Sequence, residues 1–529
     1  MPPTNKQLLS KLKAIKRKEV SNDKLEDERK EKGFIHNTKF TPPKNSLPQI
    51  TTFGPQQLPK PSDQLKESDA FYLFFDGLLD HIVTHTNEHL QKHNITTSPD
   101  SSTILQVTKE DIINYFACFF ALGAVGCNDF SLAWTKLEKF DGLVGNLFVQ
   151  TTMSKSRFVK IHRSFQANLE FIRDHVRYIS NHLFIPSSHL SCDDQLQKYK
   201  GRGKHRSKID RKADKTGLLA WELVSTFNYL HNIIFEYVLN ETYIKDKIKI
   251  PKNEYYMQQL ISPLPNNSFT FICDQGTLGG IKNAEYLNDK GMQFIMTCKK
   301  SRPSFLWNFL HKGINKREWK MVHNGKIMAI SYYAKGDGKK KKIVNLLTNI
   351  EGADDTQVIR EYDKKLKAEV EFRIPKVVTM YRKLHGSVDK RKQYESYVKS
   401  EIRQKYEWRS EMNDYLYALL TNAFIYYKNA KKLGKKYIIK IFVFKLCVQI
   451  RKVKATSKRV LSVIRNQSRK KIVYHRLTGY GGRTDCVVCK KQGRLMCDIC
   501  PEKPCLHDGL CNLKYHNPNI SIDEGLQHK

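Results

Sequence analysis

The sequence predicts a mixed α/β fold in which a strand-rich core lies between two helical regions of the chain. The apolar periodicity is helical from about residue 65 and becomes strand-like around Asp193. Residues 269–273 form a short apolar strand that ends at Asp274, and a helical stretch and a second strand follow within ~30 residues, as in a parallel crossover unit. The pattern becomes helical again beyond residue 376, so we expect helices on both sides of the core.

The composition favours a nucleic-acid partner. The 529 residues carry a net charge of +38 and a pI near 9.6, and such an excess favours a polyanion, nucleic acid before an anionic membrane. No apolar run reaches the ~18–20 residues that span a bilayer, and the polar, lysine-rich N-terminus shows no secretory signal. Six of the 12 cysteines lie from Cys486 onward, which indicates a metal module in a reducing compartment rather than a disulfide framework.

The first part of the chain divides into a tail and a helical region. Residues 1–64 are rich in charge and proline and predict a disordered basic tail. Its clusters, such as Lys16-Arg17-Lys18, are compatible with nuclear import or simply with a solvated tail. Residues 65–187 show helical periodicity, with a capping-box pattern from Thr108 to Asp111 ahead of an apolar helix.

An acidic pair followed by a basic segment marks the beginning of the core, residues 188–300. Asp193 and Asp194 end a short apolar run, and carboxylates at a strand end are good ligands for hard cations. Adjacent residues on a strand face opposite ways, so we expect Asp193 to be the ligand and Asp194 to point outward or to support the site without binding metal. The basic run, residues 198–208, would neutralise DNA phosphates, although alone it is equally compatible with a solvated loop. The candidate DNA-binding residues are Lys200, Arg202, Lys204 and Arg206.

The order of strands and acids predicts a ribonuclease-H-like catalytic core. A strand with Asp193, a hairpin, a strand with Asp274, a helix and another strand follow one another. In that arrangement acids gather at the ends of adjacent central strands, and a third acid comes from a later helix. Residues 301–375 predict an inserted β-rich subdomain with an Asn-Gly hairpin turn. The core resumes over residues 376–400, a helical segment that contains Asp389, the candidate for the third acid.

The three acids predict a two-metal site for chemistry on DNA. Two Mg²⁺ or Mn²⁺ ions ~3.5–4 Å apart activate an attacking oxygen and stabilise a leaving oxygen, and a few carboxylates must hold them. We expect Asp193 to bridge both ions, and Asp274 and Asp389 to hold one each. The alternative is that all three are ordinary surface acids.

The C-terminal part combines basic helices with a cysteine and histidine cluster. Residues 401–480 are very basic with interleaved apolar positions, which predicts helices whose basic face contacts the DNA backbone or only solvent. Residues 481–518 contain eight soft or imidazole ligands, enough for two tetrahedral Zn²⁺ sites, against the alternative of a reduced Cys-rich tail. A cross-brace is expected, with Cys486, Cys489, Cys505 and His507 on one zinc and Cys497, Cys500, Cys511 and His516 on the other. The pairing stays open, because the closely spaced Cys505 and His507 need not both be ligands.

Several motifs in this order resemble the piggyBac transposases and their domesticated relatives. The resemblance covers about residues 70–516, and the order of the motifs together with a terminal zinc pattern is specific. Each of the three candidate acids stands in its own motif, and a fourth motif follows them in the sequence. The motifs are Asp193-Asp194-Gln195-Leu196 with Lys200-Gly201-Arg202, then Ile272-Cys273-Asp274, His385-Gly386-Ser387-Val388-Asp389, Trp408 and Thr421-Asn422-Ala423-Phe424.

Two departures from the family pattern touch the rim of the predicted site. Lys392 stands three residues beyond Asp389, where the family often carries another Asp. Gln275-Gly276-Thr277-Leu278 replaces the aromatic pair that usually follows the second acid. Neither departure removes one of the three acids. They are compatible with a divergent or domesticated enzyme of altered target preference or efficiency.

The resemblance implies a DNA transposase or a domesticated excision nuclease that acts in the nucleus. Such an enzyme cleaves transposon ends through hairpin intermediates, prefers TTAA targets and works as a homodimer. Its helical DNA-binding and dimerisation region would comprise residues 65–187 and 401–480. A catalytically inactive piggyBac-derived DNA-binding protein is the main alternative, and the three intact acids favour the enzyme. A RING-type ubiquitin ligase, a third possibility, rests on the zinc pattern alone.

Overall fold

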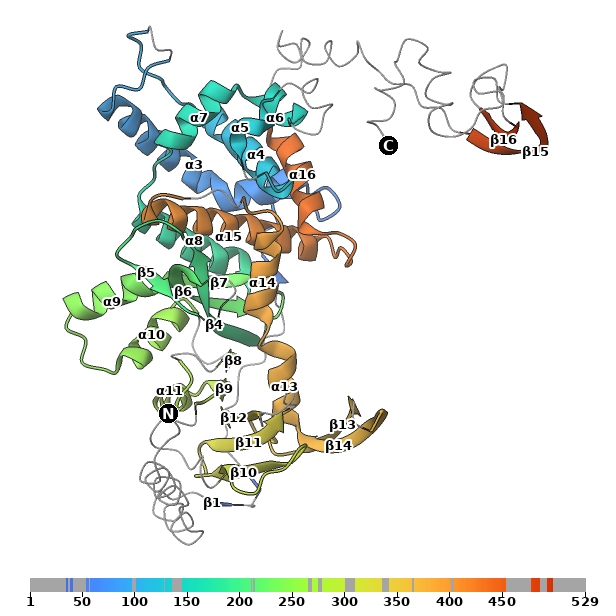
Figure 1. The fold of residues 1–529 in the computed structure, drawn as a ribbon. Helices are drawn as coiled ribbons and strands as arrows, with labels where there is room; N and C mark the ends of the chain where they lie inside the picture. The colour runs from blue at the N-terminus through green and yellow to red at the C-terminus, as the bar shows by residue number, and fades with distance from the viewer. Residues whose placement is uncertain are drawn as a thin grey trace, which may run out of the picture.

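The computed structural model describes residues 35–36, 39–40, 54–56 and 58–452, apart from 98–100, 128, 136–144, 211, 213–214, 265–268, 275–277, 300–309, 335–341, 364–365 and 401–403, together with two strands at 477–485 and 492–497. Figure 1 shows a group of helices at the top, a sheet in the middle and further strands at the bottom. No helix within these residues is both long enough and apolar enough to cross a membrane.

The helices before and after the core form one body, although the whole core separates them in sequence. They are α3 (Glu67–Lys92), α4 (Lys109–Ala124), α5 (Phe130–Ala133), α6 (Leu147–Thr152), α7 (Lys155–Ser164), α8 (Leu169–Leu183), α15 (Glu407–Ala430) and α16 (Ile439–Ile450). α15 packs against α3 and α8, and α16 packs against α3 and α4, so the two halves share one apolar core. The predicted capping box of α4 is confirmed, because the Asp111 N–H donates to Thr108 Oγ1 at 3.2 Å and the Thr108 N–H donates to Asp111 Oδ2 at 2.9 Å.

A mixed sheet carries the core. Its strands from this part of the chain are β4 (His189–Lys198), β5 (Arg206–Lys208), β6 (Thr216–Ser225), β7 (Leu230–Phe235), β8 (Thr270–Cys273) and β9 (Gln293–Thr297), with β5 at one edge of the sheet. β8 lies parallel between β4 and β9, and α11 (Ile281–Asp289) makes the crossover between β8 and β9. β6 pairs antiparallel with β4 and forms a hairpin with β7, which α9 (Glu236–Lys245) and α10 (Lys252–Ile261) follow. The predicted α/β fold and its crossover unit are confirmed.

The inserted strands extend the core sheet instead of forming a wholly separate subdomain. β10 (Trp319–His323), β11 (Met328–Ala334) and β12 (Lys342–Thr348) form an antiparallel meander, and β12 pairs with β9. Only β13 (Thr356–Asp363) and β14 (Ala368–Pro375) form a ribbon of their own, which projects from the body in Figure 1. α13 (Lys376–Leu384) and α14 (Ser387–Ser396) then lead the chain back to the core strands.

Parts of the predicted N-terminal tail pair with the body. β1 (Ile35–His36) adds to β10 at the edge of the sheet, and β2 (Gly54–Pro55) pairs with β3 (Phe184–Ile185). The Phe40 side chain is buried, and its N–H donates to Asp354 Oδ2 at 3.3 Å. These residues are paired, whereas a disordered tail was expected. Their partners lie far away in the sequence, and the local composition of the tail does not indicate such long-range pairing.

Candidate active site

Two of the predicted acids belong to neighbouring parallel strands: Asp193 lies within β4 rather than at its end, where the sequence predicted it, and Asp274 directly follows β8. Cys192 on β4 and Cys273 on β8 are partners in the parallel register. The next residues, Asp193 and Asp274, therefore lie beside each other at the C-terminal end of β8. Burial raises the pKa of the Asp193 carboxyl to about 8, together with the negative charges of Asp194 and Asp274. Without a bound cation the Asp193 carboxyl is therefore mostly protonated at neutral pH, and a cation at this position would favour its ionised form.

Asp274 is oriented by two hydroxyl groups. Thr297 on β9 donates to Asp274 Oδ1 at 2.9 Å, and Tyr381 on α13 donates to the same oxygen at 3.0 Å. Burial and the charge of Asp274 raise the pKa of Tyr381, which keeps its hydroxyl protonated as a donor. Asp274 itself is exposed, so its carboxylate is accessible from solvent.

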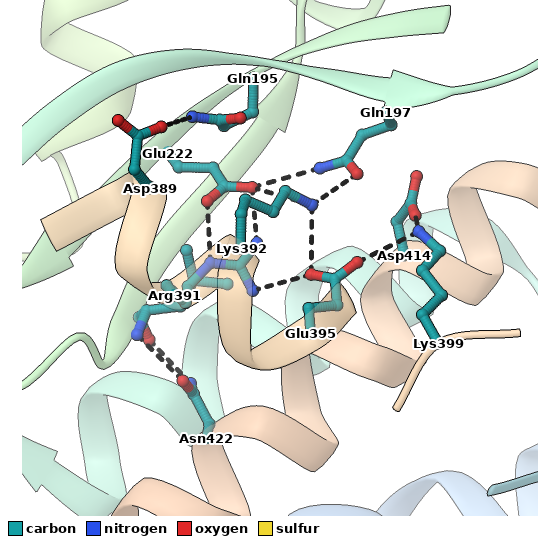
Figure 2. Close-up of polar contacts among 11 residues, drawn as sticks. Gln195, Gln197, Glu222, Asp389, Arg391, Lys392, Glu395, Lys399, Asp414 and Asn422 are labelled. Atoms are coloured by element: carbon teal, nitrogen blue, oxygen red, sulfur yellow. Dashed lines mark hydrogen bonds and ion pairs between the residues drawn. The ribbon is translucent and has the colours of Figure 1, made fainter. Parts of the chain in front are cut away.

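Asp389 approaches β4 from a helix. It lies in the first turn of α14 and is exposed. Gln195 Nε2 on β4 donates to Asp389 Oδ1 at 3.3 Å (Figure 2). Side chains two residues apart on a strand share a face, so this contact places Asp389 over the face of β4 that carries Asp193. The structure thus places Asp193 near Asp274 across neighbouring strands and Asp389 over the same face of β4.

Asp194 has a separate partner. Its carboxylate pairs with Lys212 Nζ at 2.8 Å, and Lys212 also donates to the Asp194 carbonyl at 2.6 Å. Adjacent side chains on a strand face opposite ways, so Asp194 points away from Asp193. The Asp194 N–H, in contrast, donates to Asp193 Oδ1 at 2.7 Å. Asp194 therefore contacts the site through its backbone, while its side chain is bound elsewhere.

The donor set fits a hard divalent cation in its chemistry. Carboxylate oxygens are the ligands that Mg²⁺ and Mn²⁺ prefer, and a bound cation would favour the ionised form of Asp193. Within the part of the chain that the structure describes, no three His, Cys, Asp or Glu side chains are close enough together to hold a metal ion. Asp274 bonds to Thr297 and Tyr381, and Asp389 bonds to Gln195. Metal binding would require the three carboxylates to converge from these positions.

A buried network of six charged side chains holds α14 on the sheet (Figure 2). At its centre Arg391 on α14 donates to both carboxylate oxygens of Glu222 on β6, at 2.8 and 2.6 Å, and both side chains are fully buried. Three acids meet three bases, so the charges balance inside the protein, where an unpaired charge would be costly. The members are Glu222, Arg391, Lys392, Glu395, Lys399 and Asp414.

The residues that hold the acids were not identified from the sequence. Nothing local distinguishes Thr297 and Tyr381, which contact Asp274 across 23 and 107 residues. Glu222 did carry a signal, because it is a lone carboxylate between Trp221 and Leu223 in an apolar strand. A charge at such a position must be paired when the strand is buried.

The basic run after β4 is fastened beside α15. Tyr199 Oη donates to the Lys405 carbonyl at 3.0 Å, and the His205 N–H donates to Glu407 Oε1 at 2.8 Å. These bonds hold the run against the segment that begins α15, and Arg206 Nη1 donates to the Gly201 carbonyl at 3.1 Å within the run. The predicted DNA-binding residues are all exposed: Lys200, Arg202, Lys204 and Arg206.

The predicted zinc module lies almost entirely outside the described residues. β15 (Leu477–Asp485) and β16 (Gln492–Cys497) form an antiparallel hairpin there. Of Cys497, at the end of β16, the backbone alone is described. The other predicted ligands lie outside the described residues: Cys486, Cys489, Cys500, Cys505, His507, Cys511 and His516.

Comparison with known proteins identifies the family. The family profile described as Transposase IS4 matches residues 66–424, more than half of the chain. Among solved structures, the chain is similar to the piggyBac transposase in a synaptic complex with hairpin DNA, with a TM-score of 0.63 and 18% identity over 84% of this chain and 98% of that chain. No curated protein sequence matches. The resemblance seen in the motifs is confirmed: the chain belongs to the Transposase IS4 family and has the fold of the piggyBac transposase.

Proposed function

We propose that the protein is a piggyBac-like DNA transposase, or a domesticated excision nuclease, that uses divalent metal to cleave and join DNA at transposon ends. The observation that carries this proposal is the arrangement of Asp193, Asp274 and Asp389 around β4. The solved structure that it resembles holds hairpin DNA, and a net charge of +38 suits a DNA partner. From the resemblance of its motifs we also propose that the protein prefers TTAA targets, acts as a homodimer and works in the nucleus.

The residues of the site have distinct tasks in this proposal. Asp193, Asp274 and Asp389 would hold two Mg²⁺ or Mn²⁺ ions. Such ions activate an attacking oxygen and stabilise a leaving oxygen in phosphoryl transfer. The Thr297 and Tyr381 hydroxyls orient the Asp274 carboxylate. Because Asp274 and Asp389 are exposed, a DNA phosphate would reach their carboxylates from the solvent side.

The exposed basic run would grip the DNA backbone beside the scissile phosphate. Each lysine or arginine that neutralises a phosphate releases counterions, so this grip weakens as salt increases. Because Tyr199 and His205 fasten the run to the body, DNA held there would keep a fixed position relative to Asp193. The residues assigned to this grip are Lys200, Arg202, Lys204 and Arg206.

The proposal includes two zinc ions in the C-terminal module. Eight cysteine and histidine ligands from Cys486 to His516 suit two tetrahedral sites, which would serve recognition of transposon ends or of partner proteins. Metal analysis of the purified full chain should give two zinc ions per chain, and fewer in Cys489→Ser. A zinc content near zero in the wild type would remove this part of the proposal.

Cleavage of a duplex that carries the inverted repeats flanking the gene tests the proposed activity. We expect cleavage in Mg²⁺ or Mn²⁺, no cleavage in EDTA, and loss of cleavage in Asp193→Ala, with DNA binding retained. Tight DNA binding without cleavage in either metal would instead identify a catalytically inactive DNA-binding protein of the same descent.

A further inference from the structure

One face of β4 is joined to the segment formed by α13 and α14 at three successive places. The strand residues involved are 191, 195 and 197, which alternate onto the same face as Asp193. Asp193 stands between the first two of these contacts. The contacts are Ser191 Oγ to the His385 carbonyl at 3.0 Å, Gln195 Nε2 to Asp389 Oδ1 at 3.3 Å, and Lys392 Nζ to Gln197 Oε1 at 2.5 Å.

Lys392 connects this row of contacts to the buried charge network. Its Nζ lies 3.1 Å from Glu395 Oε2 and 3.6 Å from Glu222 Oε1. Gln197 Nε2 donates to the same Glu222 oxygen at 3.2 Å. Figure 2 shows the Lys392 amine reaching toward Gln197, Glu222 and Glu395, below the contact between Gln195 and Asp389. One ammonium group therefore ties α14 both to the strand of Asp193 and to the buried charges.

These contacts fix which turn of α14 lies over Asp193. An α-helix rises ~5.4 Å per turn, so a slide of one turn would carry Asp389 out of reach of Gln195. Such a slide would also separate the fully buried Arg391 and Glu222. Leaving one charge of a buried pair without its partner is strongly destabilising, so the network opposes movement of the helix.

We propose that Lys392, acting with Gln197 and Glu222, is a positioning residue for Asp389. Its contacts set the register of α14 on β4, and this register holds the Asp389 carboxylate beside Asp193. The inference rests on the proposed metal site and adds to it. Lys392 is a cation of the charged network that holds α14 on the sheet, and it is not itself a ligand of the metal ions.

Positioning and simple electrostatics make opposite predictions for removal of this charge. A lysine near carboxylates repels a divalent cation, so Lys392→Met would strengthen metal binding if its charge alone mattered. If Lys392 positions Asp389, the same variant weakens metal binding. Residues that orient metal ligands typically cost about 10–100-fold in affinity when they are replaced.

Titration of the full chain with Mn²⁺ in the absence of DNA, followed by electron paramagnetic resonance, distinguishes the two. The signal of the site is defined as the binding lost in Asp193→Asn. We expect Lys392→Met to bind Mn²⁺ at this site at least about tenfold more weakly than the wild type. The matched control is Lys390→Met, since Lys390 is exposed on the same helix and its replacement removes the same charge. The control should bind as tightly as the wild type or slightly more tightly.

Unfolding measurements separate positioning from stability alone. A purely structural role lowers the unfolding temperature of Lys392→Met and leaves its Mn²⁺ affinity unchanged well below that temperature, which would overturn the inference. If Lys392→Met fails to fold, Gln197→Met breaks the same contact from the strand side and leaves Arg391 and Glu222 paired. It should weaken Mn²⁺ binding in the same direction, and wild-type affinity in this variant would overturn the inference too.

The two proposals fail separately. A wild type that binds Mn²⁺ through Asp193 but cleaves no DNA overturns the proposed activity and leaves the positioning role intact. A wild type that cleaves DNA, with Mn²⁺ affinity unchanged in Lys392→Met, overturns the positioning role alone.

Discussion

Asp274 and Asp389 are held in place by different means. Asp274 directly follows a strand and accepts two hydrogen bonds from neutral hydroxyls, those of Thr297 and Tyr381. Asp389 lies on a helix and accepts one bond, from Gln195. The helix itself is held by buried charges centred on the Arg391 pair with Glu222.

The difference places the two carboxylates under different physical control. The pairing of the strands determines the position of Asp274, and its hydrogen bonds from the two hydroxyls are individually worth about 1.5–3 kcal/mol because the acceptor is charged. Long-range ionic contacts set Asp389, and breaking a buried ion pair costs about 3–5 kcal/mol. The Asp389 side should therefore respond more strongly to single substitutions than the Asp274 side.

The largest effect is expected from Arg391→Met. This change leaves the fully buried Glu222 without its bidentate partner, so the free energy of unfolding should fall by about 3–5 kcal/mol. Denaturant unfolding measures the loss. The matched control is Arg360→Met, which breaks an exposed pair with Glu371 and should cost at most about 1 kcal/mol. Equal losses in the two variants would contradict the account of the buried network.

A pH dependence of stability is expected from Asp193. Its pKa is about 8 in the folded chain against an ordinary 3.8, so between these values the folded state binds a proton that the unfolded chain has released. The stability contributed by this proton is fully present below about pH 4 and is lost as the pH rises through about 8. Thermal unfolding without added divalent metal should show this decline in the wild type. Asp193→Asn should flatten it, and coincident curves for the two proteins would argue against a buried carboxyl at this position.

A smaller effect is expected from Tyr381→Phe. The variant removes one hydroxyl donor to Asp274 and leaves Thr297 in place. The free energy of unfolding should fall by about 1.5 kcal/mol, at the low end of the range of about 1.5–3 kcal/mol for one hydrogen bond to a charged group, since Asp274 is exposed. Its Mn²⁺ affinity should fall less than that of Lys392→Met. A loss of stability as large as that of Arg391→Met would erase the contrast between the two carboxylates.

The sequence predicted the features that depend on local pattern. The crossover unit from β8 through α11 to β9 follows from a strand, a helix and a strand in succession. Asp193 and Asp274 were recognised as candidates because each ends an apolar run of the sequence. The motif order located Asp389. The alternation of a strand also separated Asp193 from Asp194, whose side chain bonds to Lys212.

The remaining features depend on contacts between distant parts of the chain. Arg391 pairs with Glu222 across 169 residues, and Tyr381 reaches Asp274 across 107. The hairpin pattern of the inserted strands does not say which sheet edge they join, so the pairing of β12 with β9 was not predicted. Likewise, the charged surroundings of Phe40 give no sign that its ring is buried.

Metal binding by two neighbouring variants tests the central claim most directly. Asp193 and Asp194 are adjacent and chemically identical, but Asp193 lies at the proposed metal site and Asp194 bonds to Lys212. Mn²⁺ titration of the full chain should show that Asp193→Asn loses the site, while Asp194→Asn keeps it. Equal binding by both variants, or loss of the site in Asp194→Asn alone, would contradict the assignment of Asp193 as the ligand shared by the metal ions.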